Sequence, residues 1–215
     1  MAPSPVTSHT ATWYFDFISP FAYLQWQELR RSSLPVAWQP VPVLLVGLLQ
    51  HWGQVGPAEI PPKRRFTYRM AHWQAQRAGI ALRFPPTHPF NPLPALRLAI
   101  ALGNRPDVID RIFRHIWLEG RACDTLGSLA DLGNEFGVHL ESTLADGAVK
   151  AALRANTQHA IDAGVFGVPT MRVGEELFWG ADSGPLLREY LAAPERFDTD
   201  EIRRLDALPV GVRRE

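Results

Sequence analysis

The stretch Trp13-Tyr14-Phe15-Asp16-Phe17-Ile18-Ser19-Pro20 decides the fold prediction for this chain. Its first half is short and aromatic, which is typical of a buried strand. Ser is a preferred helix N-cap and Pro a preferred first helical residue, so the last two residues predict a helix that runs to about Arg31. Residues 36–41 predict a second strand, and the proline at position 40 indicates a sheet edge or a strand end. The chain therefore starts with a predicted strand, helix and strand.

Beyond this start the pattern becomes helical and then returns to strands. Between residues 61 and 164, five segments have helical spacing and a glycine nearby: 63–79, 93–103, 105–119, 126–137 and 141–164. Residues 84–94 contain five prolines and predict an ordered loop. Residues 168–173 and 176–179 flank a Gly174-Glu175 corner and predict a β-hairpin, and residues 182–191 predict a closing helix.

Strands at both ends of a helical middle predict an α/β fold, with one α/β unit interrupted by an all-α insertion. We expect the α/β domain over residues 12–60 and 165–215 and the helical insertion over residues 61–164. The first residues are rich in Pro, Ser and Thr and have neither an apolar stretch nor a basic start. We therefore expect a flexible tail over residues 1–11 and no signal peptide.

The composition argues against several classes of partner. The 22 basic and 22 acidic residues give a formal net charge of zero, whereas nucleic acid and anionic membranes favour a basic face. The longest apolar run, residues 41–49, is far too short to span a bilayer. The single cysteine, Cys123, excludes an internal disulfide and a cysteine-based metal site, and the histidines have no metal-ligand spacing. We expect a cytoplasmic protein without a metal, in which Cys123 is a buried structural thiol and not a nucleophile.

Ser19 has two interpretations that do not compete. As an N-cap it explains the start of the helix. A helix start that follows a strand also presents free N–H groups and the positive end of the helix dipole. An anion there gains about 0.3–2 kcal/mol from the dipole, and a hydroxyl adds a charge-assisted hydrogen bond of about 1.5–3 kcal/mol. Together these interactions would lower the pKa of a bound thiol by roughly one to three units.

The segment Gly167-Val168-Pro169-Thr170 is the second candidate for a functional site. A cis bond before Pro169 would leave the Val168 backbone free to pair with an extended ligand, as in strand addition. The alternative is a trans proline that only begins an edge strand.

Together the two segments resemble the 2-hydroxychromene-2-carboxylate isomerase family, which belongs to the DsbA-like, kappa-class glutathione transferase branch of the thioredoxin superfamily. The resemblance runs from about residue 12 to residue 204 and includes middle markers. It rests on Asp16-Phe-Ile-Ser-Pro-Phe-Ala-Tyr-Leu24, Pro61-Pro-Lys63, His88-Pro-Phe-Asn-Pro92, Trp117-Leu-Glu-Gly-Arg121, Gly164-Val-Phe-Gly-Val-Pro-Thr170 and Phe178-Trp-Gly-Ala-Asp182. It implies a thioredoxin-like α/β domain, with a helical insertion as in DsbA, and a homodimer.

Thioredoxin relatives carry a Cys-x-x-Cys pair where this chain has Ser19-Pro20-Phe21-Ala22. Without sulfur, disulfide exchange at this site is chemically impossible. A site that still handles sulfur must receive the thiol with a ligand, and the resemblance implies that this ligand is glutathione.

The resemblance also implies roles for individual residues. Ser19 would hold the glutathione sulfur as thiolate, and Val168 would pair with the cysteinyl part. Asp182 would meet the γ-glutamyl ammonium, with the Ala181 backbone beside its carboxylate. Lys63 would face a glutathione carboxylate, or it is a solvated cation at a helix start. The implied glutathione-binding set is Ser19, Pro20, Phe21, Gln54, Lys63, Val168, Pro169, Ala181 and Asp182.

Two positions depart from the family pattern. Gln54 is the nearest counterpart of an Asn that often contacts glutathione in the family. Ala181 and Ser183 replace a Gln or Ser and a charged residue, so side-chain groups are missing near the γ-glutamyl end. Either glutathione would bind more weakly, or the thiol donor would differ.

The implied reaction is the interconversion of 2-hydroxychromene-2-carboxylate and trans-o-hydroxybenzylidenepyruvate in aromatic compound catabolism. Candidate substrate-pocket residues, each of which also suits a core or loop-stabilising role, are Phe21, Tyr23, Leu44, Leu45, His88, Phe90 and Asn91. Ser19 is the candidate catalytic residue. The alternatives are a kappa-like transferase or peroxidase and a non-enzymatic glutathione-binding protein.

Overall fold

The computed structural model describes residues 10–212 and contains one four-stranded sheet in that range. The strands are β1 (Ala11–Phe15), β2 (Trp38–Pro42), β3 (Thr170–Val173) and β4 (Glu176–Trp179). Their order is β2-β1-β3-β4, with β1 parallel to β2 and the other pairs antiparallel. Since β2 is an edge strand, its Pro40 removes no bond from the middle of the sheet, as predicted.

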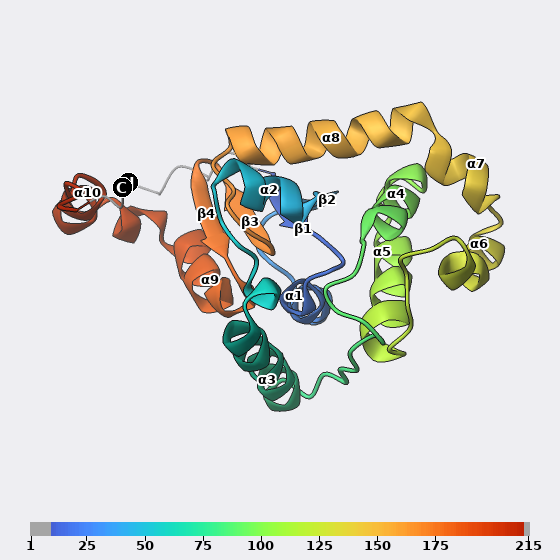
Figure 1. The fold of residues 1–215 in the computed structure, drawn as a ribbon. Coiled ribbons are helices and arrows are strands. Elements are labelled where there is room, and N and C mark those ends of the chain that lie inside the picture. Colours follow the sequence, from blue (N-terminus) through green and yellow to red (C-terminus); the bar gives the residue numbers. More distant parts are fainter. Residues whose placement is uncertain (1–9, 213–215) are drawn as a thin grey trace.

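Most of the described chain is helical. The helices are α1 (Pro20–Arg31), α2 (Leu45–His51), α3 (Pro61–Arg77), α4 (Leu93–Ala101), α5 (Pro106–Phe113), α6 (Ala130–Phe136), α7 (Leu140–Ala145), α8 (Gly147–Asp162), α9 (Gly184–Ala192) and α10 (Asp200–Asp206). Short 3-10 segments are η1 (Pro57–Glu59), η3 (Gly127–Leu129), η4 (Ala181–Ser183) and η5 (Pro194–Phe197), and the π-helical segment η2 (Arg114–Leu118) continues α5. In Figure 1, α4 to α7 lie on one side of the sheet, and the long α8 leads back to it.

The α/β fold interrupted by helices is therefore confirmed, with differences in detail. The predicted helix over residues 141–164 is wrong, because the chain forms α7 and α8 with a break at Asp146. The Asp146 carboxylate accepts a hydrogen bond of 2.7 Å from Ala148 N and so caps a new helix. Helices α2 and α10 were not predicted. The apolar run that contains α2 lacks a helical periodicity, which is why this helix was missed. In Figure 1, α10 and α6 lie at opposite ends of the molecule.

An aromatic cluster joins the central strand to the first helix. Trp13 stacks on Phe15 and on Trp26, with ring centroids 4.6 and 5.4 Å apart. The Trp13 indole also donates a hydrogen bond of 2.6 Å to Gln25 Oε1. Stacked pairs add about 0.5–1.5 kcal/mol to the free energy of area burial, and replacing a core tryptophan with alanine costs about 3–5 kcal/mol. The start of α1 is thus attached to a rigid core.

The predicted N-terminal tail can be compared with the structure only at its end. Residues 1–9 lie outside the described range, and Ala11 is the first residue of β1 and fully buried. The division into an α/β domain and an insertion at residues 61–164 stays a prediction. Between residues 10 and 212, no helix is long and apolar enough to cross a membrane.

Candidate functional site

Ser19 is the N-cap of α1, and its hydroxyl keeps a proton to donate. The side chain is only 6% exposed, and its Oγ accepts a bond of 3.2 Å from Ala22 N. No described residue accepts a hydrogen bond from this hydroxyl. Capping occupies a lone pair of the oxygen, whereas stabilising a thiolate would use its hydrogen. The N-cap interpretation is confirmed, and it leaves the catalytic one open.

The turn before Ser19 is held by Asp16, a residue to which the sequence analysis assigned no role. Asp16 is fully buried. Its Oδ1 accepts from Ile18 N at 3.1 Å, and its Oδ2 accepts from Leu45 N at 2.9 Å. The backbone oxygen of Asp16 accepts from Ser19 N at 3.1 Å. One carboxylate thus joins the end of β1, the Ser19 turn and the start of α2.

Burial dominates the electrostatics of Asp16. It raises the pKa of the carboxyl from its ordinary 3.8 to about 7, against the opposing effect of the Leu45 and Ile18 N–H groups. Near neutral pH this carboxyl is therefore partly protonated, which reduces the negative charge behind Ser19. An acid directly after a buried aromatic strand was the signal available in the sequence.

His88 holds the same turn from the proline-rich loop. Its Nε2 lies 2.8 Å from Ile18 O, and its Nδ1 lies 2.7 Å from the Tyr68 hydroxyl. A carbonyl only accepts, so in the neutral ring Nε2 carries the proton and Nδ1 can only accept. The single hydrogen of the Tyr68 hydroxyl is shared between Nδ1 and the backbone oxygen of His88, which lies 2.8 Å away. Burial lowers the pKa of His88 and favours this neutral form. Because both ring nitrogens are engaged, the geometry favours the loop-stabilising role of His88 over a role in the substrate pocket.

The Val168–Pro169 peptide bond is cis, as the functional interpretation of this segment expected. Within the described residues, neither backbone polar group of Val168 has a hydrogen-bond partner. Pro169 O accepts from Gly180 N at 2.9 Å, and Gly180 O accepts from the Gln25 side chain at 3.1 Å. These bonds bring the proline loop and the segment before Asp182 against α1. Gln25 was not predicted, and no local pattern marks it.

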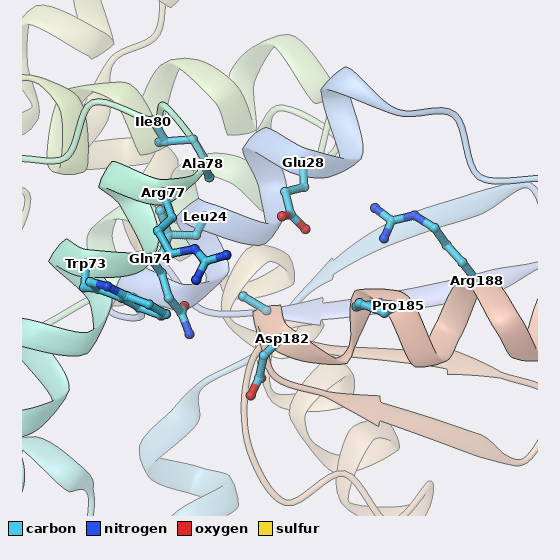
Figure 2. Close-up of a pocket in the computed structure, with 11 residues that line it drawn as sticks. Leu24, Glu28, Trp73, Gln74, Arg77, Ala78, Ile80, Asp182, Pro185 and Arg188 are labelled. Carbon is cyan, nitrogen blue, oxygen red and sulfur yellow. The ribbon is translucent and has the colours of Figure 1, made fainter.

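A cleft of about 400 Å³ lies between α1, the C-terminal half of α3 and the start of α9 (Figure 2). Two predicted residues, Ala181 and Asp182, line it, whereas Ser19, Lys63 and Val168 do not. The lining residues are Leu24, Glu28, Trp73, Gln74, Arg77, Ala78, Ile80, Ala181, Asp182, Pro185 and Arg188. The cleft therefore adjoins the predicted γ-glutamyl end of the site and extends away along α1.

The other predicted binding residues do not line the cleft. Lys63 is exposed in the first turn of α3, and Gln54 is exposed just after α2. The Trp52 indole donates a bond of 3.0 Å to Val165 O, which holds the end of α2 beside the loop that leads to Pro169. Pro20 is buried at the first position of α1.

The predicted substrate-pocket residues differ in exposure. Phe21, Leu44, Leu45 and Phe90 are half-buried at the edge of the core. Tyr23 is only 2% exposed and donates a hydrogen bond of 2.9 Å to Ala81 O, so the structure places it in the core. Asn91 is exposed, and its Oδ1 accepts from Leu93 N at 3.1 Å at the start of α4.

The remaining sequence candidates concern sulfur and metal. Cys123 is 1% exposed, and burial raises the pKa of its thiol. The nearby Asp124 and Asp16 carboxylates raise this pKa further. A thiol in this environment is a poor nucleophile. Among residues 10–212, no group of three or more His, Cys, Asp or Glu side chains could hold a metal ion.

Residues 10–192 match the family described as DSBA-like thioredoxin domain. This chain belongs to that family. The predicted resemblance and the thioredoxin-like fold are thereby confirmed.

Individual relatives point in the same direction. The chain is 30% identical over 179 residues to 2-hydroxychromene-2-carboxylate isomerase of Pseudomonas putida, covering 79% of this chain and 87% of that protein. It is 27% identical to glutathione S-transferase kappa 2 of Caenorhabditis elegans, covering 84% and 91%. A solved structure of 2-hydroxychromene-2-carboxylate isomerase superimposes with a TM-score of 0.74 at 25% identity, covering 93% of this chain and 100% of that one.

Proposed function

We propose that this DSBA-like protein is a glutathione-dependent isomerase of the 2-hydroxychromene-2-carboxylate type. The observation that carries the proposal is Ser19, a helix N-cap whose hydroxyl hydrogen has no acceptor among the described residues, at a position that lacks sulfur. The buried Cys123 is unsuited to replace it. The sulfur must therefore come from a ligand, and the names of the relatives support glutathione and an isomerase.

The start of α1 would activate the thiol of glutathione. Free N–H groups and the helix dipole favour an anion at this point, and the Ser19 hydroxyl would donate to the sulfur. No acidic side chain occurs in the first turn of α1. The elevated pKa of Asp16 further limits negative charge behind the sulfur. The expected result is a bound thiol that is ionised near neutral pH.

Backbone groups and charges would orient the tripeptide. The unpartnered Val168 N–H and C=O would pair with the cysteinyl part in the manner of an added strand. Asp182 and the Ala181 backbone would meet the γ-glutamyl group, and Lys63 would face a carboxylate. Gln54, Pro20 and Phe21 would complete the contacts near α2 and α1.

The reaction would be a reversible addition and elimination. The thiolate forms a C–S bond to the conjugated chromene ring, and the ring C–O bond breaks so that the ring oxygen leaves as a phenolate. The double bond shifts in this step, so the hydroxyl-bearing carbon becomes an enol and the former double bond is free to rotate. Collapse of the enol to the ketone then expels the thiolate, and the enol proton passes to the phenolate, which gives trans-o-hydroxybenzylidenepyruvate. Orientation and thiolate activation are the contributions of the protein. Phe21, Leu44, Leu45 and Phe90 would form the apolar wall for the aromatic ring.

A kappa-like transferase or peroxidase is the second candidate, and the similarity to a kappa-class glutathione transferase favours it. Both enzymes would use the same thiolate. Incubation with glutathione and either 2-hydroxychromene-2-carboxylate or 1-chloro-2,4-dinitrobenzene separates them. We expect turnover of the chromene acid. Turnover of 1-chloro-2,4-dinitrobenzene alone would favour the transferase function over the isomerase function.

The third candidate is a glutathione-binding protein without catalysis. Calorimetric binding of glutathione with no turnover of either substrate would favour it. The proposal also places the protein in the cytoplasm, where a reducing environment keeps glutathione in its thiol form. The homodimer expected from the resemblance is tested by the mass of the protein in solution.

A further inference from the structure

We propose that Arg64, in the first turn of α3, binds the carboxylate of the aromatic substrate and so makes the enzyme selective for aromatic acids. The inference rests on the proposed isomerase function and adds a specificity-determining residue to it. The chromene acid of that function carries a carboxylate, for which neither Ser19 nor His88 is available. The Ser19 hydroxyl hydrogen would serve the sulfur, and both ring nitrogens of His88 are engaged. The substrate charge therefore needs a cation from another element.

Helix α3 is joined to the turn before Ser19 through one histidine. The Tyr68 hydroxyl lies 2.7 Å from His88 Nδ1, and His88 Nε2 donates to Ile18 O at 2.8 Å. Arg64 precedes Tyr68 by four positions (68 − 64), which is about one helical turn, so the two side chains lie on the same face of α3. The face of α3 that carries Arg64 is therefore the one that meets the histidine beside Ser19.

The charge of Arg64 acts on both rings of this link. Burial has the largest effect on each group, and it raises the pKa of Tyr68 and lowers the pKa of His88. The Arg64 guanidinium lowers the pKa of both groups, because a nearby cation favours the tyrosinate and disfavours the imidazolium. The exposed Arg65 and Arg69 on the same helix have no such effect on either ring. Arg64 is thus the cation of α3 whose charge reaches the Tyr68–His88 pair.

Arg64 is also free to bind an anion. Its side chain is exposed, and among residues 10–212 no carboxylate lies within 4.0 Å of its guanidinium nitrogens. Helix α3 contains no Asp or Glu. Glu59, the nearest acid before the helix, accepts from Gly56 N at 2.7 Å and is engaged there. An unpaired guanidinium presents a planar set of donors that matches both oxygens of a carboxylate.

Aromatic side chains surround the same histidine. The half-buried Phe84 and Phe90 have ring centroids 6.0 and 5.8 Å from that of His88, and the fully buried Trp117 lies at 5.6 Å. The Trp117 indole donates a hydrogen bond of 2.8 Å to Phe17 O, so this cluster is attached to the turn before the catalytic position. The surroundings of His88 therefore combine aromatic surface with an unpaired cation, which is the chemistry that recognises an aromatic carboxylate.

Calorimetric titration of the glutathione-loaded protein with two ring analogues tests the inference. Chromone-2-carboxylate carries the charge, and chromone-2-carboxamide has the same rings without it. We expect Arg64→Gln to raise the dissociation constant for the carboxylate about tenfold, the effect of losing a charge-assisted hydrogen bond at an exposed site. The constants for the carboxamide and for glutathione should each change less than about twofold. Arg64→Lys should recover part of the loss, because it keeps the charge without the planar fork.

Steady-state kinetics with 2-hydroxychromene-2-carboxylate give a second readout. Arg64→Gln should raise KM about tenfold and leave kcat within about twofold, because the carboxylate does not change during the reaction and a contact to it is made equally in the ground state and the transition state. A fall in kcat with KM unchanged would contradict a role in substrate binding and overturn the inference.

Arg69→Gln is the matched control. Arg69 is exposed on the same helix and lies five positions from Arg64 (69 − 64), so it points about 140° away from it. Arg69→Gln should bind both analogues as the unmodified protein does. An unchanged constant for the carboxylate in Arg64→Gln, equal losses for both analogues, or an equal loss in Arg69→Gln would overturn the inference and leave the proposed function standing.

The proposed function can also fail separately. If Arg64→Gln selectively loses the carboxylate but the unmodified protein does not turn over the chromene acid, the isomerase function fails and the Arg64 site remains. If the unmodified protein does not bind the carboxylate analogue at all, the inference is overturned.

Discussion

The two ends of the proposed glutathione site are built in opposite ways. At the Ser19 end, the side chain and the turn before it are buried and held by Asp16 and His88. At the Asp182 end, the charged groups that line the cleft are exposed or half-buried and form no ion pairs with described residues. Buried polar groups have to be hydrogen-bonded, and those bonds hold them in one geometry, whereas exposed charges cost little and stay adjustable. The first end is suited to chemistry and the second to recognition.

The buried end should respond most strongly to the loss of a single atom. We expect Ser19→Ala to lower the turnover of the chromene acid at least tenfold, and about a hundredfold if the hydroxyl acts like an oxyanion-hole donor. The rise of turnover with pH should also shift to higher pH, because the bound thiol loses its hydrogen-bond donor. Steady-state kinetics over a range from about pH 6 to about pH 9, in which a thiol with a lowered pKa ionises, measures both effects.

Ser19→Thr is the control, since it keeps a hydroxyl that can cap α1 and donate to sulfur. Loss of the cap alone should cost only about 0.5–2 kcal/mol of stability, which urea unfolding would report. If Ser19→Ala retains full activity at neutral pH, stabilisation of the thiolate by this hydroxyl is disproved.

The second prediction concerns the buried carboxyl behind Ser19. Folded Asp16 keeps a proton that the unfolded chain loses, so its contribution to stability falls as the pH rises through the unfolded pKa and levels off above about 7. Relative to Asp16→Asn, which cannot ionise, the unmodified protein should lose about 2.5 kcal/mol of unfolding free energy between pH 5 and pH 8. Urea unfolding at both pH values measures this difference.

Asp206→Asn is the control, because Asp206 is exposed on α10. Its stability relative to the unmodified protein should not change over the same range. A difference between Asp16→Asn and the unmodified protein that is independent of pH would show that Asp16 does not retain its proton on folding. The buried end would then carry a full negative charge.

The third prediction tests how the proline-rich loop holds the turn. His88→Ala removes the bonds to Ile18 O and to the Tyr68 hydroxyl, and we expect a loss of about 2 kcal/mol in unfolding free energy. Turnover should fall while the dissociation constant for glutathione stays nearly constant, because the turn loosens but the ligand contacts remain.

Tyr68→Phe sharpens this result. It removes only the hydroxyl and should cost about 1 kcal/mol, with a smaller loss of turnover. If His88→Ala weakens glutathione binding more than it lowers turnover, His88 contacts the ligand and does not act by positioning the Ile18–Ser19 turn.

The smallest effect is expected at Lys63, an exposed cation in the first turn of α3. Lys63→Gln should raise the dissociation constant for glutathione about threefold at low salt, and the difference should shrink as salt is added, because exposed charges are screened. Calorimetry at two ionic strengths measures it. No change at either ionic strength would identify Lys63 as the solvated cation at a helix start.

Local features of the fold were predictable from the sequence. The strand and helix on either side of Ser19, the edge position of β2 and the β-hairpin after Pro169 follow from residue preferences that act within a few positions. The break at Asp146 was missed, although an aspartate cap is also a local signal. The apolar periodicity continues through it and outweighed the cap in the prediction.

By itself, the sequence determined that a helix starts at Ser19 without a sulfur atom and that a proline loop precedes the last hairpin. Only the tertiary structure decided what surrounds that start. Asp16 bonds to a residue 29 positions away, and His88 to one 70 positions away. The cleft beside Asp182 likewise joins α1, α3 and α9, which come from distant parts of the chain. Preferences for caps and turns act between neighbours, whereas these contacts exist only once packing has brought distant segments together.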